Sequence, residues 1–166
     1  MTVLVTASSR HGSTAGIADA IADGLTKRGI EARMVAPEDV MGLDGYTAVV
    51  IGSAVYAGHW LEEGRALVDS HAAGLRELPV WLFSSGPLGE PGHLTPEQDT
   101  VDAAPIVKAT GAIAHRTFAG RLDKAKLKFT ERAMVIAFKA PEGDFRDWEA
   151  IDAYAGEIAQ RLQADG

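Results

Sequence analysis

The side chains best suited to binding a ligand lie near the start of the chain, at residues 8–14. This segment reads Ser8-Ser9-Arg10-His11-Gly12-Ser13-Thr14 and stands between an apolar run, Val3-Leu4-Val5, and a helical pattern. A loop between a strand and a helix directs the first N–H groups of the helix to one spot, where an anion such as a phosphate binds. Serine and threonine hydroxyls add further donors. The segment therefore predicts a phosphate site, and the alternative is that Ser13 or Thr14 only caps the helix.

Two common nucleotide-binding motifs do not fit this loop. The Walker motif requires Gly-Lys-Ser/Thr, and no lysine follows Gly12. The dinucleotide fingerprint requires three spaced glycines, and only Gly12 and Gly16 are present. A loop that holds a phosphate through hydroxyls and backbone amides is what remains, and it is typical of a site for flavin mononucleotide (FMN).

The composition narrows the chemistry further. The 166 residues include no cysteine, which excludes disulfides, thiolate metal sites and cysteine nucleophiles, so redox chemistry would need a bound organic cofactor. The five histidines are scattered without the spacing of helical metal ligands, and no metal site is predicted. The net charge of -7 argues against nucleic-acid binding. No apolar run is long enough to span a bilayer and no signal peptide opens the chain, so a cytoplasmic location is expected.

Apolar runs of strand length alternate with helical patterns along the whole chain. The predicted strands are Thr2–Thr6, Glu31–Ala36, Ala48–Gly52, Val80–Ser84 and Ile113–Ala119. The predicted helices are Thr14–Arg28, Leu61–Leu78 and Asp147–Leu162, the last capped by Asp144 or Asp147. This alternation predicts an α/β three-layer sandwich, a five-stranded parallel sheet in the order 2-1-3-4-5 within one domain over residues 1–166. In that order the ligand crevice lies at the carboxyl ends of the first and third strands.

Three segments resemble the flavodoxin-like superfamily. They read SSRHGST after the first predicted strand, IGSAVYAGHW at the third and FSSGPLG at the fourth. Within the superfamily, the arginine of the first segment, Gly58-His59-Trp60 and Asp147-Trp148 are similar to the branch related to menaquinone-dependent protoporphyrinogen IX dehydrogenase.

The resemblance implies an FMN site built from three loops. The phosphate loop would comprise Ser8, Ser9, Arg10, His11, Gly12, Ser13 and Thr14. The isoalloxazine ring would lie along Ser53, Ala54, Val55, Tyr56, Ala57 and Gly58, and its opposite edge along Ser84, Ser85, Gly86, Pro87 and Leu88. Arg10 would either pair with the phosphate or face solvent. Tyr56 is the favoured stacking residue, whereas Trp60 would either touch the flavin or pack in the core. No catalytic side chain is assigned, because the flavin itself takes the hydride.

The resemblance also implies a function. The chain would be an FMN-dependent oxidoreductase that passes electrons from a reduced organic donor to a quinone-like acceptor. The branch takes its name from the oxidation of protoporphyrinogen, which is the specific activity implied. The alternative is a flavodoxin-type electron carrier that serves other redox proteins. An extension at about 120–145, between the fifth strand and the last helix, favours the enzyme. Its segment 121–139 mixes basic and apolar residues, and would either lie peripherally on the inner face of an anionic membrane or form an ordinary solvated helix.

Overall fold

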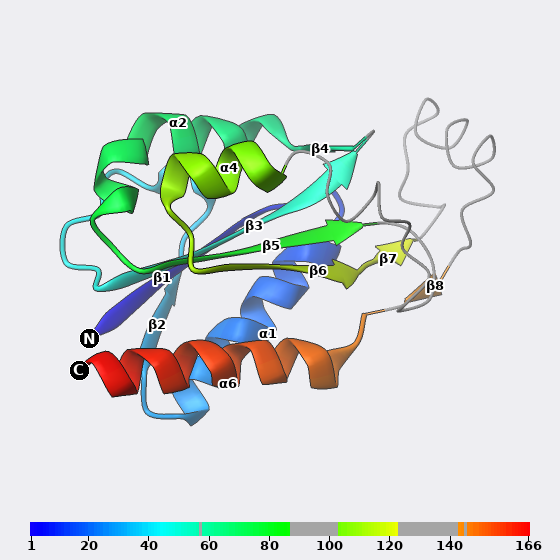
Figure 1. Ribbon diagram of the computed structural model, residues 1–166. Coiled ribbons are helices and arrows are strands. Elements are labelled where there is room, and N and C mark those ends of the chain that lie inside the picture. Colours follow the sequence, from blue (N-terminus) through cyan, green and yellow to red (C-terminus); the bar gives the residue numbers. More distant parts are fainter. Residues whose placement is uncertain (57, 87–102, 123–142, 145) are drawn as a thin grey trace.

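A parallel β-sheet forms the centre of the computed structural model (Figure 1). The structure describes residues 1–56, 58–86, 103–122, 143–144 and 146–166. The main strands are β1 (Thr2–Ser8), β2 (Glu31–Met34), β3 (Ala48–Tyr56), β5 (Val80–Gly86) and β6 (Ala114–Ala119). They pair in parallel in the order β2-β1-β3-β5-β6. The predicted strand order is thereby confirmed, since the short strand β4 (His59–Trp60) pairs only with β3.

Helices cover both faces of the sheet, which gives the expected three layers (Figure 1). One face carries α1 (Ser13–Lys27) and α6 (Trp148–Asp165), and the other carries α2 (Glu62–Arg76) and α4 (Ala103–Thr110). Successive side chains of a strand point to opposite faces. Val3 and Val5 therefore pack with α1 and α6, whereas Leu4 packs with α2 and α4. This double coverage explains why the strand sequences read as continuous apolar runs.

An aromatic group joins α6 to the sheet. The rings of Phe83 and Phe118 have centroids 6.2 Å apart, and those of Phe118 and Tyr154 are 5.8 Å apart. The Tyr154 hydroxyl donates to the Leu82 carbonyl over 2.8 Å, and burial raises the pKa of this phenol. A Cβ on Gly52 would lie 2.0 Å from the Phe83 ring, so the ring occupies the space that any larger residue would need.

Three strands extend beyond their predicted ends, which corrects the loop assignments. β1 continues to Ser8, β3 to Tyr56 and β5 to Gly86. The predictions ended each strand where serines and glycines replace apolar residues. Ladder hydrogen bonds use backbone groups, however, and do not depend on side-chain polarity. Residues 53–56 and 84–86 are therefore strand rather than loop.

Five further elements of the described residues were not predicted. They are a 3-10 turn, η1 (Pro37–Asp39), together with β4, α4, β7 (Arg121–Leu122) and β8 (Gly143–Asp144). β7 and β8 pair antiparallel. The predicted extension at 120–145 and the basic segment 121–139 lie mostly outside the described residues, with only their ends in view. Among the helices of the described part, none combines the length and apolar character needed to cross a bilayer.

Candidate functional site

The carboxyl ends of β1, β3 and β5 meet at one edge of the sheet, as the parallel order requires (Figure 1). A row of hydroxyl-bearing residues crosses the sheet just below this edge. Ser8 is in register with Ser53, Ser53 with Ser84, and Ser84 with Thr117. The three serines are buried. The loops above this row form the candidate site.

The first loop leads into α1 through a glycine in the left-handed region. Gly12 is the N-cap residue, with φ of 87°, and its N–H donates to Ser9 Oγ over 3.0 Å. No side chain caps α1 and no acidic residue stands in its first turn. The alternative that Ser13 or Thr14 caps this helix is therefore wrong. The first N–H groups of a helix have no acceptor within the helix, so this end of α1 can donate to a ligand.

These features fit the phosphate of FMN. The positive end of α1 carries no carboxylate in its first turn, and the loop that leads into it contains the hydroxyls of Ser9 and Ser13. The hydroxyl of Ser13 also accepts the N–H of Arg121 over 2.8 Å. Thr14 is buried. The side chain of Ser8 points toward α2, on the face of the sheet opposite to α1, because its hydroxyl lies 3.0 Å from the position of a Cβ on Gly64 in α2.

The second loop is a hairpin between β3 and β4. Tyr56 is in register with His59, and Gly58 between them has φ of 79°, the left-handed region that favours glycine. Residue 57 lies outside the described residues. The Arg10 guanidinium lies 4.7 Å from the centroid of the Tyr56 ring, a cation–π contact that joins the first loop to the second. Arg10 is exposed, yet it is engaged with Tyr56 rather than simply solvated.

Trp60 belongs to the core. Its side chain is 2% exposed and packs with Leu4 and Ile51. Its indole N–H donates to Ser84 Oγ over 2.8 Å, and the same oxygen lies 2.7 Å from His115 Nε2. Of the two roles considered for Trp60, packing in the core is confirmed.

The third loop begins at the end of β5. Ser85 and Gly86 are buried there, while Pro87 and Leu88 lie outside the described residues. The chain after β6 passes over this point, because a Cβ on Gly120 would lie 2.5 Å from the Gly86 carbonyl oxygen and 3.3 Å from Ser13 Oγ. The turn between β6 and β7 therefore packs against both the first loop and the start of the third loop.

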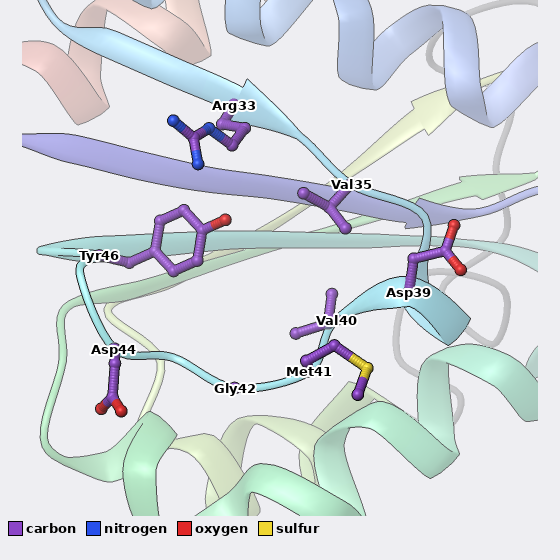
Figure 2. Close-up of a pocket in the computed structure, with 8 residues that line it drawn as sticks. All are labelled: Arg33, Val35, Asp39, Val40, Met41, Gly42, Asp44 and Tyr46. Atoms are coloured by element: carbon purple, nitrogen blue, oxygen red, sulfur yellow. The ribbon is translucent and has the colours of Figure 1, made fainter.

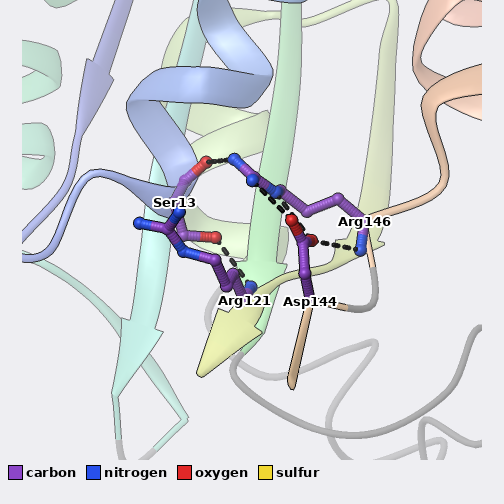
Figure 3. Close-up of polar contacts among 4 residues, drawn as sticks. All are labelled: Ser13, Arg121, Asp144 and Arg146. Atoms are coloured by element: carbon purple, nitrogen blue, oxygen red, sulfur yellow. Dashed lines mark hydrogen bonds and ion pairs between the residues drawn. The ribbon is translucent and has the colours of Figure 1, made fainter. Parts of the chain in front are cut away.

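A polar group that was not among the predicted site residues packs beside the first loop. Arg146 donates to Asp144 through Nε (2.9 Å) and through its terminal nitrogen (2.7 Å), and it reaches the Ser13 carbonyl at 3.5 Å (Figure 3). Its hydrogen bonds are the main reason that the pKa of Asp144 lies below its usual value. The only sequence signal for this contact is Gly16, a glycine in the first turns of a helix. A Cβ there would lie 2.6 Å from the Arg146 guanidinium.

A separate pocket lies at the β2 edge of the sheet (Figure 2). Its lining comes from the end of β2 and from the connection to β3: Arg33, Val35, Asp39, Val40, Met41, Gly42, Asp44 and Tyr46. None of the predicted cofactor residues lines it. Among the described residues, no group of three or more histidine and acidic side chains is placed to hold a metal ion.

Comparison with known proteins identifies the family. Residues 4–148 match the flavodoxin domain family. Protoporphyrinogen IX dehydrogenase [quinone] of Escherichia coli (strain K12) is 26% identical over 176 residues, which cover 96% of this chain and 95% of that protein.

Solved structures agree with the fold. A flavodoxin from the domain Archaea aligns with a TM-score of 0.66 at 15% identity, covering 98% of this chain and 99% of its own. Oxidised Flavodoxin 1 from Bacillus cereus aligns with a TM-score of 0.62 at 14% identity, covering 96% and 98%. The chain therefore belongs to the flavodoxin domain family, whose cofactor is FMN.

Proposed function

We propose that residues 1–166 form one FMN-binding domain that passes electrons from a reduced organic donor to a quinone-like acceptor. The observation that carries this proposal is the N-terminus of α1, which Gly12 opens without a side-chain cap and without an acidic first turn. The similarity to a quinone-dependent dehydrogenase over nearly the whole chain supports the reaction class. Oxidation of protoporphyrinogen is the specific reaction proposed.

In this proposal the first loop binds the phosphate. The N–H groups that open α1 and the hydroxyls of Ser9 and Ser13 donate to the phosphate oxygens. Ser8 and Thr14, both buried, support the loop from below. Arg10 brings a positive charge to the same region while it lies over Tyr56. Bound FMN supplies the hydride and electron chemistry of its ring system.

The second and third loops orient the ring system. Tyr56 is half-buried and is held by Arg10, so its ring is placed to stack rather than left to rotate. Gly58 lets the backbone approach closely, because no side chain intervenes. Below the loops, the hydrogen bond from the Trp60 indole N–H to the Ser84 hydroxyl links β4 to β5 and supports the second loop. Residues 84–88 are proposed to line the opposite edge of the ring.

A flavodoxin-type electron carrier is the second candidate. The chain and the archaeal flavodoxin cover each other almost completely, so this chain has the size of a carrier. The net charge of -7 would also suit docking to basic redox proteins.

One experiment separates the two candidates. The purified protein is added to FMN until the flavin fluorescence is fully quenched. Protoporphyrinogen IX is then supplied with a menaquinone analogue under anaerobic conditions. The enzyme proposal expects porphyrin fluorescence to rise only when both FMN and the quinone are present. If quinone stays oxidised while a redox protein is reduced readily, the carrier is favoured instead. A protein that does not quench FMN at micromolar concentration contradicts both.

Peripheral contact with a membrane belongs to the same proposal. The segment 121–139 contains six basic and two acidic residues, and each basic residue near an anionic surface contributes about 1 kcal/mol of attraction. We expect the protein to sediment with vesicles that contain anionic lipid and to remain free of zwitterionic vesicles. Equal behaviour with both vesicle types would contradict this contact.

A further inference from the structure

The strands β7 and β8 form a short antiparallel ribbon, with Arg121 in register with Asp144, and this ribbon is attached to the first turn of α1. Figure 3 shows Ser13 between the two attachments. On one side the Arg121 N–H donates to Ser13 Oγ over 2.8 Å, and on the other the Arg146 guanidinium reaches the Ser13 carbonyl at 3.5 Å. A residue of the proposed phosphate loop is thus held by segments more than a hundred positions away.

Arg146 is the better constrained of the two attachments. Its side chain is 10% exposed. Two of its nitrogens donate to the Asp144 carboxylate, and its backbone N–H donates to the same carboxylate over 3.1 Å. The Cζ atom of the guanidinium lies 4.6 Å from the centroid of the Trp148 ring, a cation–π contact. These contacts leave one end of the guanidinium free to meet α1, in a fixed direction.

The surface of α1 is shaped for this contact. A Cβ on Gly16 would lie 2.6 Å from a terminal guanidinium nitrogen of Arg146, so any larger residue at this position would displace the end of the arginine side chain from its present place on the helix. Gly16 also donates its N–H to the Gly12 carbonyl over 3.0 Å, which is the first hydrogen bond of the helix. The guanidinium therefore packs directly on the turn whose N–H groups face the proposed phosphate.

We propose that Arg146 is a positioning residue for the FMN phosphate, which fixes the first turn of α1 against the β7–β8 ribbon. This inference rests on the proposed function. It assigns to Arg146 no contact with the cofactor, only control over where the N–H groups of α1 point. Because coupling between two sites is reciprocal, bound FMN stabilises the ribbon to the same extent as the ribbon strengthens FMN binding.

The test compares two arginines that hold the two ends of α1. Arg28, next to the C-terminus of α1, makes a two-point ion pair with Asp152 of α6, with both contacts at 2.9 Å. Arg146→Met and Arg28→Met thus each remove one ion pair beside α1, at opposite ends. The affinities for FMN and for riboflavin, which lacks the phosphate, are measured by fluorescence quenching at neutral pH.

We expect Arg146→Met to weaken FMN binding by about tenfold, a typical size for coupling between sites. Riboflavin binding should change little, and Arg28→Met should leave the FMN affinity close to that of the wild type. Arg146→Lys keeps the charge without the planar geometry and should fall between the wild type and Arg146→Met.

Removing Arg146 alone also leaves the Asp144 carboxylate uncompensated, which could repel a phosphate. The double variant D144N/R146M removes both charges and is expected to bind FMN as weakly as Arg146→Met. If it recovers the wild-type affinity, charge repulsion explains the effect and the positioning role is overturned. The role is also overturned if Arg28→Met weakens FMN binding as much as Arg146→Met does. A wild-type protein that does not bind FMN overturns the proposed function and this inference together.

Discussion

The indole N–H of Trp60 donates to the hydroxyl of Ser84 over 2.8 Å. This bond joins the hairpin after β3 to the neighbouring strand β5, beneath the proposed flavin site. The Ser84 oxygen is also 2.7 Å from His115 Nε2, so a hydrogen-bonded chain runs from the second loop to β6 at the edge of the sheet. The position of the second loop is thus set by buried polar contacts as well as by apolar packing.

Replacing Trp60 should therefore destabilise the protein. Trp60→Phe removes the hydrogen bond and part of a buried side chain, and we expect a loss of about 2 kcal/mol in the free energy of unfolding. Urea denaturation followed by circular dichroism measures the change. Trp148→Phe is the control, because that residue is 46% exposed and phenylalanine keeps an aromatic ring beside Arg146, so the loss should stay below about 0.5 kcal/mol. Equal losses in the two variants would contradict the buried role of Trp60.

Substitutions of two glycines at opposite ends of α1 distinguish the effect of backbone strain on stability from the effect on FMN binding. Gly12 and Gly29 have φ of 87° and 83°, and a Cβ on either would meet no atom within 4 Å. Gly12→Ala and Gly29→Ala should each cost about 1 kcal/mol of stability, since alanine is strained in this region. Only Gly12→Ala should also weaken FMN binding, because only Gly12 leads into the proposed phosphate loop. Thermal unfolding and FMN titration of both variants provide the measurement, and equal FMN affinities would argue against the site.

Gly52→Ala should be among the most damaging single changes to the core. The added Cβ would lie 2.0 Å from the Phe83 ring in the middle of the sheet, and overpacking of this severity costs about 3 kcal/mol or more. The double variant G52A/F83L should recover part of that loss, because the smaller side chain releases the space. Gly42→Ala, where a Cβ would meet nothing, is the control. A double variant that is no more stable than Gly52→Ala would contradict this packing.

Tyr154 predicts a decline in stability at alkaline pH. Burial raises the pKa of its phenol above the ordinary value near 10, so the folded state favours the neutral form. Its contribution is complete below the unfolded pKa of about 10 and is lost as the pH rises toward the folded pKa.

Tyr154→Phe should lose about 1 kcal/mol at neutral pH with the hydrogen bond to Leu82. It should also show a smaller decline in stability than the wild type between about pH 9 and pH 11. Denaturation curves across this range test both statements. Parallel pH profiles for the two proteins would exclude Tyr154 as the group responsible.

The layout of the fold follows from local patterns in the sequence. Val3–Val5 and Val80–Phe83 read as strands because both faces of the sheet are covered, and α1 begins one residue before its predicted start because Gly12, not Ser13, is the cap. Asp147, one of two candidates, caps α6 by accepting the Ala150 N–H over 3.0 Å. Periodicity and capping act over a few residues, and these features could therefore be predicted.

Other features depend on contacts between distant segments. The ribbon of β7 and β8 contacts Ser13 across more than a hundred residues, and no local pattern reports such a contact. The eight-residue helix α4 was missed because Pro105 stands within its apolar sequence and interrupts the pattern. The direct contacts of the predicted cofactor residues with FMN stay a prediction. Trp60 shows the limit of residue type alone, since an aromatic ring beside a proposed flavin site proves to be core.

The strand β2 borders the sheet, and its four residues include an oppositely charged pair, Glu31 and Arg33, at 3.9 Å. Short border strands that carry charge are poor templates for backbone pairing with another polypeptide. Addition of a second copy along this border would bury both charges at a cost in hydration. The charged side chains of β2 thus disfavour aggregation at this edge of the sheet, where unpaired backbone N–H and C=O groups would otherwise pair with another strand.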